Sequence, residues 1–314
     1  MKCSSCESLI VQKVCIRDNM YVNNTNFQYY YCKTCNSYFL DRNTLSKDYT
    51  LYPKDYYSFK VNKKESSLTK ILKDKRTQYY TQKSSFLGFF LSLIFPNDCL
   101  KPFSKLYVKK NYKILDIGCG SAHLLKQLNS AGFNNLTGVD PYINEDINCG
   151  ENLNIYKKEI HDINSKYDII CLNHSFEHMP DQLSVLLKLE SILEKNGLII
   201  IRIPLVQNRI INKFGLNWIQ FDAPRHHSLL SEKGFCNLIK KANLYIVEKY
   251  FDSTSFVFWG SYLASLKIPL SDRRKMTYKA KVGLKLSIVF GILYSRYINF
   301  RKQGDQACFI LRKY

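Results

Sequence analysis

From residue 106 onward, the chain alternates short apolar runs with longer segments in which apolar residues recur every three or four positions. Short apolar runs are typical of strands buried on both faces of a sheet, and the longer spacing is typical of amphipathic helices. This alternation predicts an α/β fold in which a seven-stranded, largely parallel sheet carries helices on both faces. The predicted strands are 113–117, 136–140, 154–157, 167–172, 198–203, 245–250 and 306–312, and the clearest helices are 121–131 and those that follow Pro180 and Ser231.

The first predicted strand ends in a turn with two glycines, Gly118 and Gly120, separated by the small residue Cys119. A strand, a glycine turn and a helix in this order open a Rossmann-like nucleotide-binding fold. The third glycine of the dinucleotide fingerprint is replaced by His123, and Asp116 stands two residues before the first glycine. A carboxylate in this turn would repel a pyrophosphate and attract a cation. The turn therefore predicts a cationic nucleotide ligand.

The ends of two further predicted strands carry polar residues that belong to the same expected crevice. Asp140 closes the second strand, at the distance from the glycine turn where an acid meets ribose hydroxyls in this architecture. Pro141 follows it and can flank a flat ring. Asn173 and His174 follow the fourth strand. Because ligands of such sheets bind at the carboxyl ends of the strands, we expect these residues to line one site.

Four motifs in this order resemble the class I S-adenosylmethionine-dependent methyltransferases, over roughly residues 106 to 314. Their usual Pro-Gly-Gly before the fifth strand is Lys-Asn-Gly here, which changes a turn and not the chemistry. The motifs are Leu-Asp-Ile-Gly-Cys-Gly at 115–120, Gly-Val-Asp at 138–140, Phe-Glu-His-Met-Pro-Asp at 176–181 and Leu-Glu-Lys-Asn-Gly-Leu-Ile-Ile-Ile at 193–201.

The resemblance implies S-adenosylmethionine as cofactor, with one contact for each part of that molecule. Asp116 would favour the cationic methionine end, and Asp140 would take the ribose hydroxyls. Asp162 and Ile163 would meet the adenine through a hydrogen bond and an apolar contact. Asn173 and His174 would line the crevice beside the methyl group, and Gly118, Cys119, Gly120 and Pro141 would complete the cofactor set.

Transfer from this cofactor is a direct displacement at carbon, so alignment supplies much of the acceleration, and a hydroxyl or carbon acceptor also needs a base. The candidates for this base are Glu177, His178, His226 and His227. Histidine titrates near neutral pH, which favours His178 and His226. Two alternatives stay open. The Glu-His pair can instead fix the loop after the fourth strand, and Arg225 with His226 and His227 can instead bind a phosphate or carboxylate of the acceptor.

The first 45 residues contain two matched cysteine pairs, Cys3 with Cys6 and Cys32 with Cys35. Two such pairs on a strand-rich background resemble a zinc ribbon, whose four thiolates hold a structural Zn²⁺ ion. A closed shell leaves no position for catalysis, so we expect a role in folding and docking. Redox activity of one pair is the alternative. Cys15 belongs to neither pair and is not expected to bind the zinc ion.

Two segments outside the motifs are less specific. Residues 46–105 are expected to form a helical linker or lid, and about 255–300 a helical insertion in the methyltransferase domain of 106–314. Each contains an apolar stretch, at 85–95 and 282–294, and basic residues flank the second. Both stretches fit helical cover over a pocket. The first also fits a buried helix or a surface element that touches a membrane, and the second fits peripheral contact with an anionic membrane. Neither reaches the length of a transmembrane helix.

Lysine and arginine number 46 against 26 acidic residues, a net charge of +20. This excess either marks an anionic partner or follows from an Asn-, Ile-, Tyr- and Lys-rich composition. The 11 cysteines do not indicate a secreted disulfide scaffold in a chain of 314 residues without a signal-peptide pattern. We therefore expect a cytoplasmic protein.

The segment Asp-Ala-Pro-Arg-His-His at 222–227, together with the cysteine module, resembles a group of methyltransferases acting on sugars, polysaccharides or secondary metabolites. The leading hypothesis is O- or C-methylation of a small-molecule or glycan precursor, with Arg225 and His227 on the acceptor and Arg225 facing a phosphate if the acceptor is nucleotide-linked. The charge and the zinc module leave RNA methylation as an alternative. A zinc-ribbon binding protein without catalytic activity is the third hypothesis.

Overall fold

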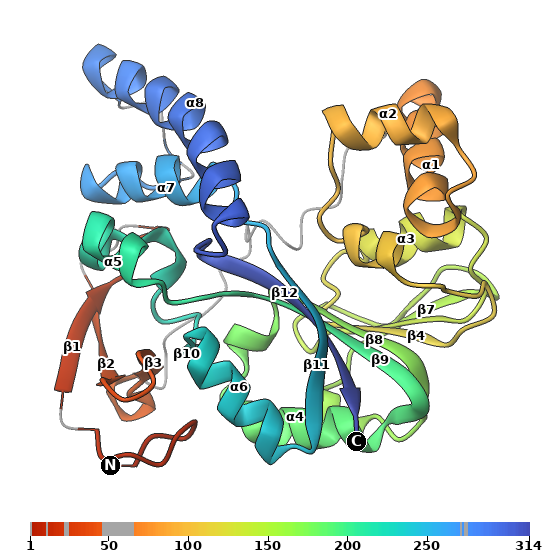
Figure 1. Ribbon diagram of the computed structural model, residues 1–314, viewed down its shortest axis with the longest axis horizontal. Helices are drawn as coiled ribbons and strands as arrows, with labels where there is room; N and C mark the ends of the chain where they lie inside the picture. The colour runs from red at the N-terminus through yellow and green to blue at the C-terminus, as the bar shows by residue number, and fades with distance from the viewer. Residues whose placement is uncertain (1, 11, 22–24, 46–65, 271, 273–275) are drawn as a thin grey trace.

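The centre of the computed structural model is an eight-stranded sheet (Figure 1). The structure describes residues 2–10, 12–21, 25–45, 66–270, 272 and 276–314. Four neighbouring pairs are parallel, and β12 runs antiparallel to both of its neighbours. In spatial order the strands are β11 (Leu244–Phe251), β12 (Gln306–Lys313), β9 (Leu193–Pro204), β8 (Tyr167–Asn173), β4 (Ile114–Ile117), β5 (Leu136–Val139), β7 (Leu153–Tyr156) and β6 (Ile147–Asn148).

The α/β prediction is confirmed, and the predicted count of seven strands is wrong. The additional strand is β6, which pairs antiparallel with β7 at the edge of the sheet. Both of its residues are exposed. An exposed two-residue strand needs no apolar run, so the hydrophobic pattern gives no signal for it.

The sheet is covered on both faces because its strand residues alternate between two hydrophobic clusters. Leu115, Ile170 and Ile199 pack in one cluster with α4 (Gln182–Ser191) and α6 (Glu232–Lys241). Their strand neighbours Ile114, Ile169 and Ile200 pack in the other with α3 (His123–Ser130). Side chains one residue apart on a strand point to opposite faces, which produces this division.

A second, four-stranded sheet contains the cysteine pairs. Its order is β1 (Gln12–Arg17), β2 (Asn26–Cys32), β3 (Ser37–Leu40) and β10 (Ser228–Leu229), with every pair antiparallel. The last strand comes from the segment that follows the Pro-Arg-His-His motif, about 190 residues beyond β3. The N-terminal sheet is thus completed by the methyltransferase-like part of the chain.

Helices also form where the two less specific segments were predicted to be helical. In the first, α1 (Ser67–Gln82) and α2 (Phe86–Ile94) stand above α3 in Figure 1, and residues 46–65 lie outside the described part. In the second, α7 (Phe256–Ser265) packs against α8 (Tyr278–Phe300), and 271 and 273–275 lie outside it. The remaining helical elements are α5 (Asn208–Phe214), η1 (Arg42–Thr44), η3 (Lys101–Lys105), η4 (Ile160–Asp162), η5 (Phe176–His178), η6 (Gly215–Asn217) and η7 (Ile219–Phe221).

Candidate active site

The glycine turn after β4 is held against the ends of two neighbouring strands. Gly118 has φ +71°, and both its N–H and that of Cys119 donate to the carbonyl of Val139 at the end of β5. A Cβ on Gly118 would lie 2.5 Å from the Cβ of Ser175, in the loop after β8. Glycine is therefore required here both for its backbone angle and for the close approach of the loop.

Asp140 follows β5 and closes over the same turn. Its two oxygens accept from the N–H groups of Gly120 and Tyr142, each at 2.9 Å. The side chain is buried, which raises the pKa of the carboxyl above its ordinary value. Each oxygen keeps a lone pair, so the carboxylate can still accept from two ligand hydroxyls.

Asp116 lies at the base of the turn and is 4% exposed. Burial, and then the nearby charge of Asp140, raise the pKa of its carboxyl to about 7, while a hydrogen bond from Asn173 opposes the shift. Across the described ranges, no lysine or arginine pairs with Asp116, and the buried Oδ1 of Asn173 has no hydrogen-bond partner. A cationic group with N–H donors would satisfy both side chains.

The remaining predicted cofactor residues lie after β5, β7 and β8. Pro141 directly follows Asp140. The Asp162 carboxylate ends η4 and accepts from the N–H of Glu159, and Ile163 beside it is buried. His174 has φ +53°, and burial lowers its pKa to about 3. All three strands end at one edge of the sheet, where the prediction places the cofactor.

The structure adds an ionic cluster that the motifs did not indicate. Arg202, at the end of β9, donates its Nε–H to Asp252 at 2.5 Å, and its Nη2 lies 3.5 Å from Asp98. The carbonyl of Arg202 accepts from the N–H of His174, so this cluster borders the same strand ends. The available signal was that Arg202 is the single charge in the apolar run 198–203, because such a charge needs a buried partner.

Glu177, His178 and His226 gather into one group, although the last is 48 residues from His178. Their ligand-type atoms all lie within 4.8 Å of one another, and the two imidazole centroids are 4.6 Å apart. Burial lowers the pKa of each of these histidines to about 4 and raises the pKa of Glu177. Three of the four candidate bases therefore form one cluster, whose imidazoles are neutral at pH 7.

Arg225 requires a correction. Its guanidinium is 1% exposed and donates to Asp222 and, through both terminal nitrogens, to Asp18, which directly follows β1. These two carboxylates occupy the donors that a substrate phosphate would need, so the predicted phosphate contact does not fit this side chain. The pairing of Asp18 with Arg225, 207 residues apart, instead ties the turn after β1 to the segment that leads into β10.

His227 remains a candidate for binding the acceptor. Burial lowers its pKa to about 4, and its buried Nδ1 has no partner within the part of the chain that the structure describes. Its backbone N–H donates to the carbonyl of Glu177 at 2.8 Å, and its carbonyl accepts from Leu40. The residue therefore joins the Glu-His loop to the N-terminal sheet.

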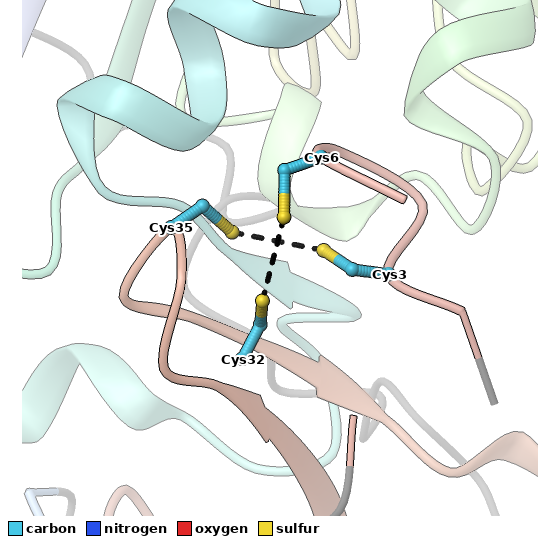
Figure 2. A group of neighbouring side chains, drawn as sticks. All are labelled: Cys3, Cys6, Cys32 and Cys35. Atoms are coloured by element: carbon cyan, nitrogen blue, oxygen red, sulfur yellow. Dashed lines mark hydrogen bonds between the residues drawn. The ribbon is translucent and has the colours of Figure 1, made fainter. Parts of the chain in front are cut away.

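The four cysteines of the two pairs point their sulfurs toward one centre, as Figure 2 shows. The Sγ atoms of Cys3 and Cys35 lie 3.6 Å apart, and those of Cys6 and Cys32 lie 3.5 Å apart. Thiolates ~2.3 Å from a tetrahedral zinc ion lie about 3.8 Å from one another. The arrangement can thus hold a zinc ion, and Cys15 is exposed on β1, outside it.

Comparison with known families assigns the chain. A family model described as a methyltransferase domain matches residues 91–249, just over half of the chain. The chain belongs to this methyltransferase family. No curated protein matches the sequence. The methyltransferase assignment makes S-adenosylmethionine the methyl donor, and sets aside the hypothesis of a binding protein without catalytic activity.

Solved structures similar to this methyltransferase share little sequence with it. The cyclopropane synthase MmaA2 from Mycobacterium tuberculosis is 15% identical, with a TM-score of 0.44 over 67% of this chain and 80% of that one. Coclaurine N-methyltransferase, bound to N-methylheliamine and S-adenosylhomocysteine, is 14% identical, with a TM-score of 0.41 over 80% and 88%.

The environment of Asp116 predicts a pH dependence of donor binding by the methyltransferase. Below pH 7 its carboxyl is mostly protonated, and a neighbouring cation favours the carboxylate, so binding must release a proton. The affinity for S-adenosylmethionine should therefore rise with pH, by up to about tenfold per unit below pH 7, and level off above it.

Titration calorimetry in buffers of different ionisation enthalpy measures both the affinity and the released proton. Asp116→Asn should bind more weakly and lose the pH dependence. Glu151→Ala, an exposed residue, is the control and should behave like the wild-type protein. An unchanged pH dependence in Asp116→Asn would show that Asp116 does not face the cationic part of the donor.

Proposed function

We propose that this methyltransferase transfers a methyl group from S-adenosylmethionine to a hydroxyl or carbon of a small acceptor, a sugar or glycan precursor. The observation that carries the proposal is the position of the Glu177, His178 and His226 cluster. Ser175, two residues before Glu177, donates to the carbonyl of Ile117 at 2.7 Å, directly before the glycine turn. Ser175 packs against the proposed donor site, and the proposed proton acceptors Glu177 and His178 come shortly after it in the sequence.

The reaction is a displacement at the methyl carbon. An electron pair of the acceptor forms the new bond as the bond from carbon to sulfur breaks, and the sulfonium becomes the neutral thioether of S-adenosylhomocysteine. Alignment of donor and acceptor supplies much of the acceleration. The acceptor proton must also leave, for which Glu177, His178 and His226 are the proposed residues. Imidazoles with pKa values near 4 are weak bases at pH 7, whereas the raised pKa of Glu177 favours that carboxylate.

We propose that residues 1–45 form a zinc-ribbon-like module with Zn²⁺ on Cys3, Cys6, Cys32 and Cys35. Contacts with the start of α6 support a docking role. Ser5 Oγ donates to the carbonyl of Gly234 at 2.7 Å, and Lys233 Nζ donates to the carbonyl of Thr34 at 2.8 Å. The Ser231 hydroxyl donates to the Cys35 carbonyl. The module would therefore position the 222–227 segment beside the cluster, with residues 46–105 and 255–300 as cover over the domain of 106–314.

The acceptor assay tests the function. Labelled S-adenosylmethionine is incubated with the protein and nucleotide sugars, lipid-linked and free glycans, and RNA. We expect label in a sugar or glycan, and a loss of about tenfold to a hundredfold in Asp140→Ala, which removes charge-assisted hydrogen bonds to the donor. The exposed Glu151→Ala is the matched control.

Two results would contradict this proposal. Label in RNA alone would replace it with the RNA alternative, for which the net charge of +20 is the supporting observation. If the protein binds the donor but labels none of these acceptors, sugars, glycans and RNA would all be excluded as its substrates.

We also propose that α2 and α8 bind an anionic membrane surface, which would bring the enzyme to a lipid-linked precursor. Both helices stand on the same side of the sheet in Figure 1. Large apolar side chains are exposed on each, including Leu93 at 61%, Leu286 at 65% and Phe300 at 84%. Neither helix contains an acidic residue, and α8 carries Lys279, Lys281, Lys285 and Arg296. Within the described residues, no helix is long and apolar enough to span the bilayer.

Vesicle cosedimentation tests the membrane contact. The protein should bind vesicles that contain phosphatidylglycerol, bind phosphatidylcholine vesicles weakly, and lose affinity as salt is raised. Leu286→Gln with Leu293→Gln should weaken binding at least about tenfold, because two exposed leucines lose burial in lipid. Leu187→Gln, at an exposed leucine on α4, should have no effect. Equal binding by the double variant and this control would overturn the contact.

A further inference from the structure

The Glu177, His178 and His226 cluster has features that a proton-accepting role leaves unexplained. Two of its members belong to η5, directly after β8, and the third follows η7. Glu177 is 2% exposed and His226 is 5% exposed. Three groups that can each give a ligand atom, all within 4.8 Å of one another, are close enough to share one ion.

Both imidazoles are oriented by backbone carbonyls. His178 Nδ1 lies 3.0 Å from the carbonyl oxygen of Arg225, and His226 Nδ1 lies 2.7 Å from that of Gln220. A carbonyl only accepts, so each Nδ1 carries the proton and each Nε2 carries a lone pair. Histidine ligands of metal ions show this arrangement, in which the second ring nitrogen donates to a carbonyl or carboxylate.

The segment that supplies these carbonyls is itself fixed. Arg225 is held by Asp18 and Asp222, as described above, and the N–H groups of Arg225 and His226 donate to the carbonyl of Asp222. Asp222 Oδ2 lies 3.9 Å from His226 Nε2, beyond hydrogen-bond distance. The orientation of both rings therefore depends on backbone and on a buried ion pair, as a preorganised ligand set requires.

The carboxylate of Glu177 supplies an independent observation. Its Oε1 lies 3.2 Å from Nδ1 of His174, whereas its Oε2 is buried and has no hydrogen-bond partner among the described residues. A buried oxygen of a carboxylate without a donor is costly, because the charge has lost water and gained nothing in return. A cation beside Oε2 would remove this cost.

We propose that Glu177, His178 and His226 bind one divalent first-row transition-metal ion through a carboxylate oxygen and two Nε2 atoms. Two histidines and one carboxylate leave coordination positions open for a further oxygen ligand. The role of the ion rests on the proposed function. An acceptor hydroxyl on the ion would be held beside the donor, and the ion would lower its pKa so that its proton passes to water. In this arrangement the three side chains would act as ligands in place of the proton-accepting role proposed above.

The experiment uses the full chain, purified with zinc on its cysteines, and needs no acceptor. Mn²⁺ is titrated and followed by the electron paramagnetic resonance signal of the free ion, and Co²⁺ is followed by its absorption spectrum. The zinc-filled thiolates leave the imidazole and carboxylate ligands as the available site. We expect one equivalent of either ion to bind the wild-type protein. Glu177→Gln and His226→Gln should each weaken this binding at least tenfold. His123→Gln, at an exposed histidine on α3, should bind like the wild type.

Thermal unfolding and donor binding by calorimetry are measured on the same samples. Two variants at different positions are used so that the test remains informative if one of them does not fold. Loss of metal binding in a folded variant that still binds S-adenosylmethionine would support the site. Absence of Mn²⁺ and Co²⁺ binding to the wild type, or unchanged binding in both variants, would overturn it. If the wild type binds the donor in that case, the methyltransferase function stands without the metal.

Discussion

The contact between Ser175 and the glycine turn fixes the relative position of the two loops that form the candidate site. The hydroxyl of Ser175 donates to the carbonyl of Ile117, and its Cβ occupies the space that a side chain on Gly118 would need. This contact joins the loop after β8 to the turn after β4. As a result, the two buried carboxylates Asp116 and Asp140 of the proposed donor site lie next to the loop that carries Glu177 and His178, the proposed proton-accepting or metal-binding residues. Donor and acceptor chemistry therefore meet at one edge of the sheet.

A second constraint keeps the acceptor side in place. Asp18, directly after β1 of the N-terminal sheet, and Asp222 hold Arg225, whose carbonyl in turn orients His178. Strand β10, directly after this segment, completes the N-terminal sheet. The cysteine module is thus structurally coupled to the cluster through backbone and ion pairs. If the module holds zinc as proposed, these contacts are the route by which it would influence chemistry at the strand ends.

Much of the sheet could be predicted because strands buried on both faces leave apolar runs that turns and helices interrupt. The edge strand β6 is exposed on both residues and leaves no such run. The role of Arg225 was missed for a different reason. A sequence shows that a charge exists, but its partner Asp18 lies 207 residues away and only the fold brings them together. The role of His226 as a base stays a prediction, because the motif gives only its residue type, whereas its distance from Glu177 and His178 and the orientation of its ring depend on tertiary contacts.

The most direct test of the account is a crystal structure of the protein with S-adenosylhomocysteine and Mn²⁺. The account predicts the ribose on Asp140, the methionine ammonium beside Asp116, and the thioether sulfur facing the Glu177, His178 and His226 cluster, with the ion on its three side chains. Nucleoside density away from the glycine turn would contradict the donor site. A sulfur that faces away from the cluster would contradict its proposed part in methyl transfer.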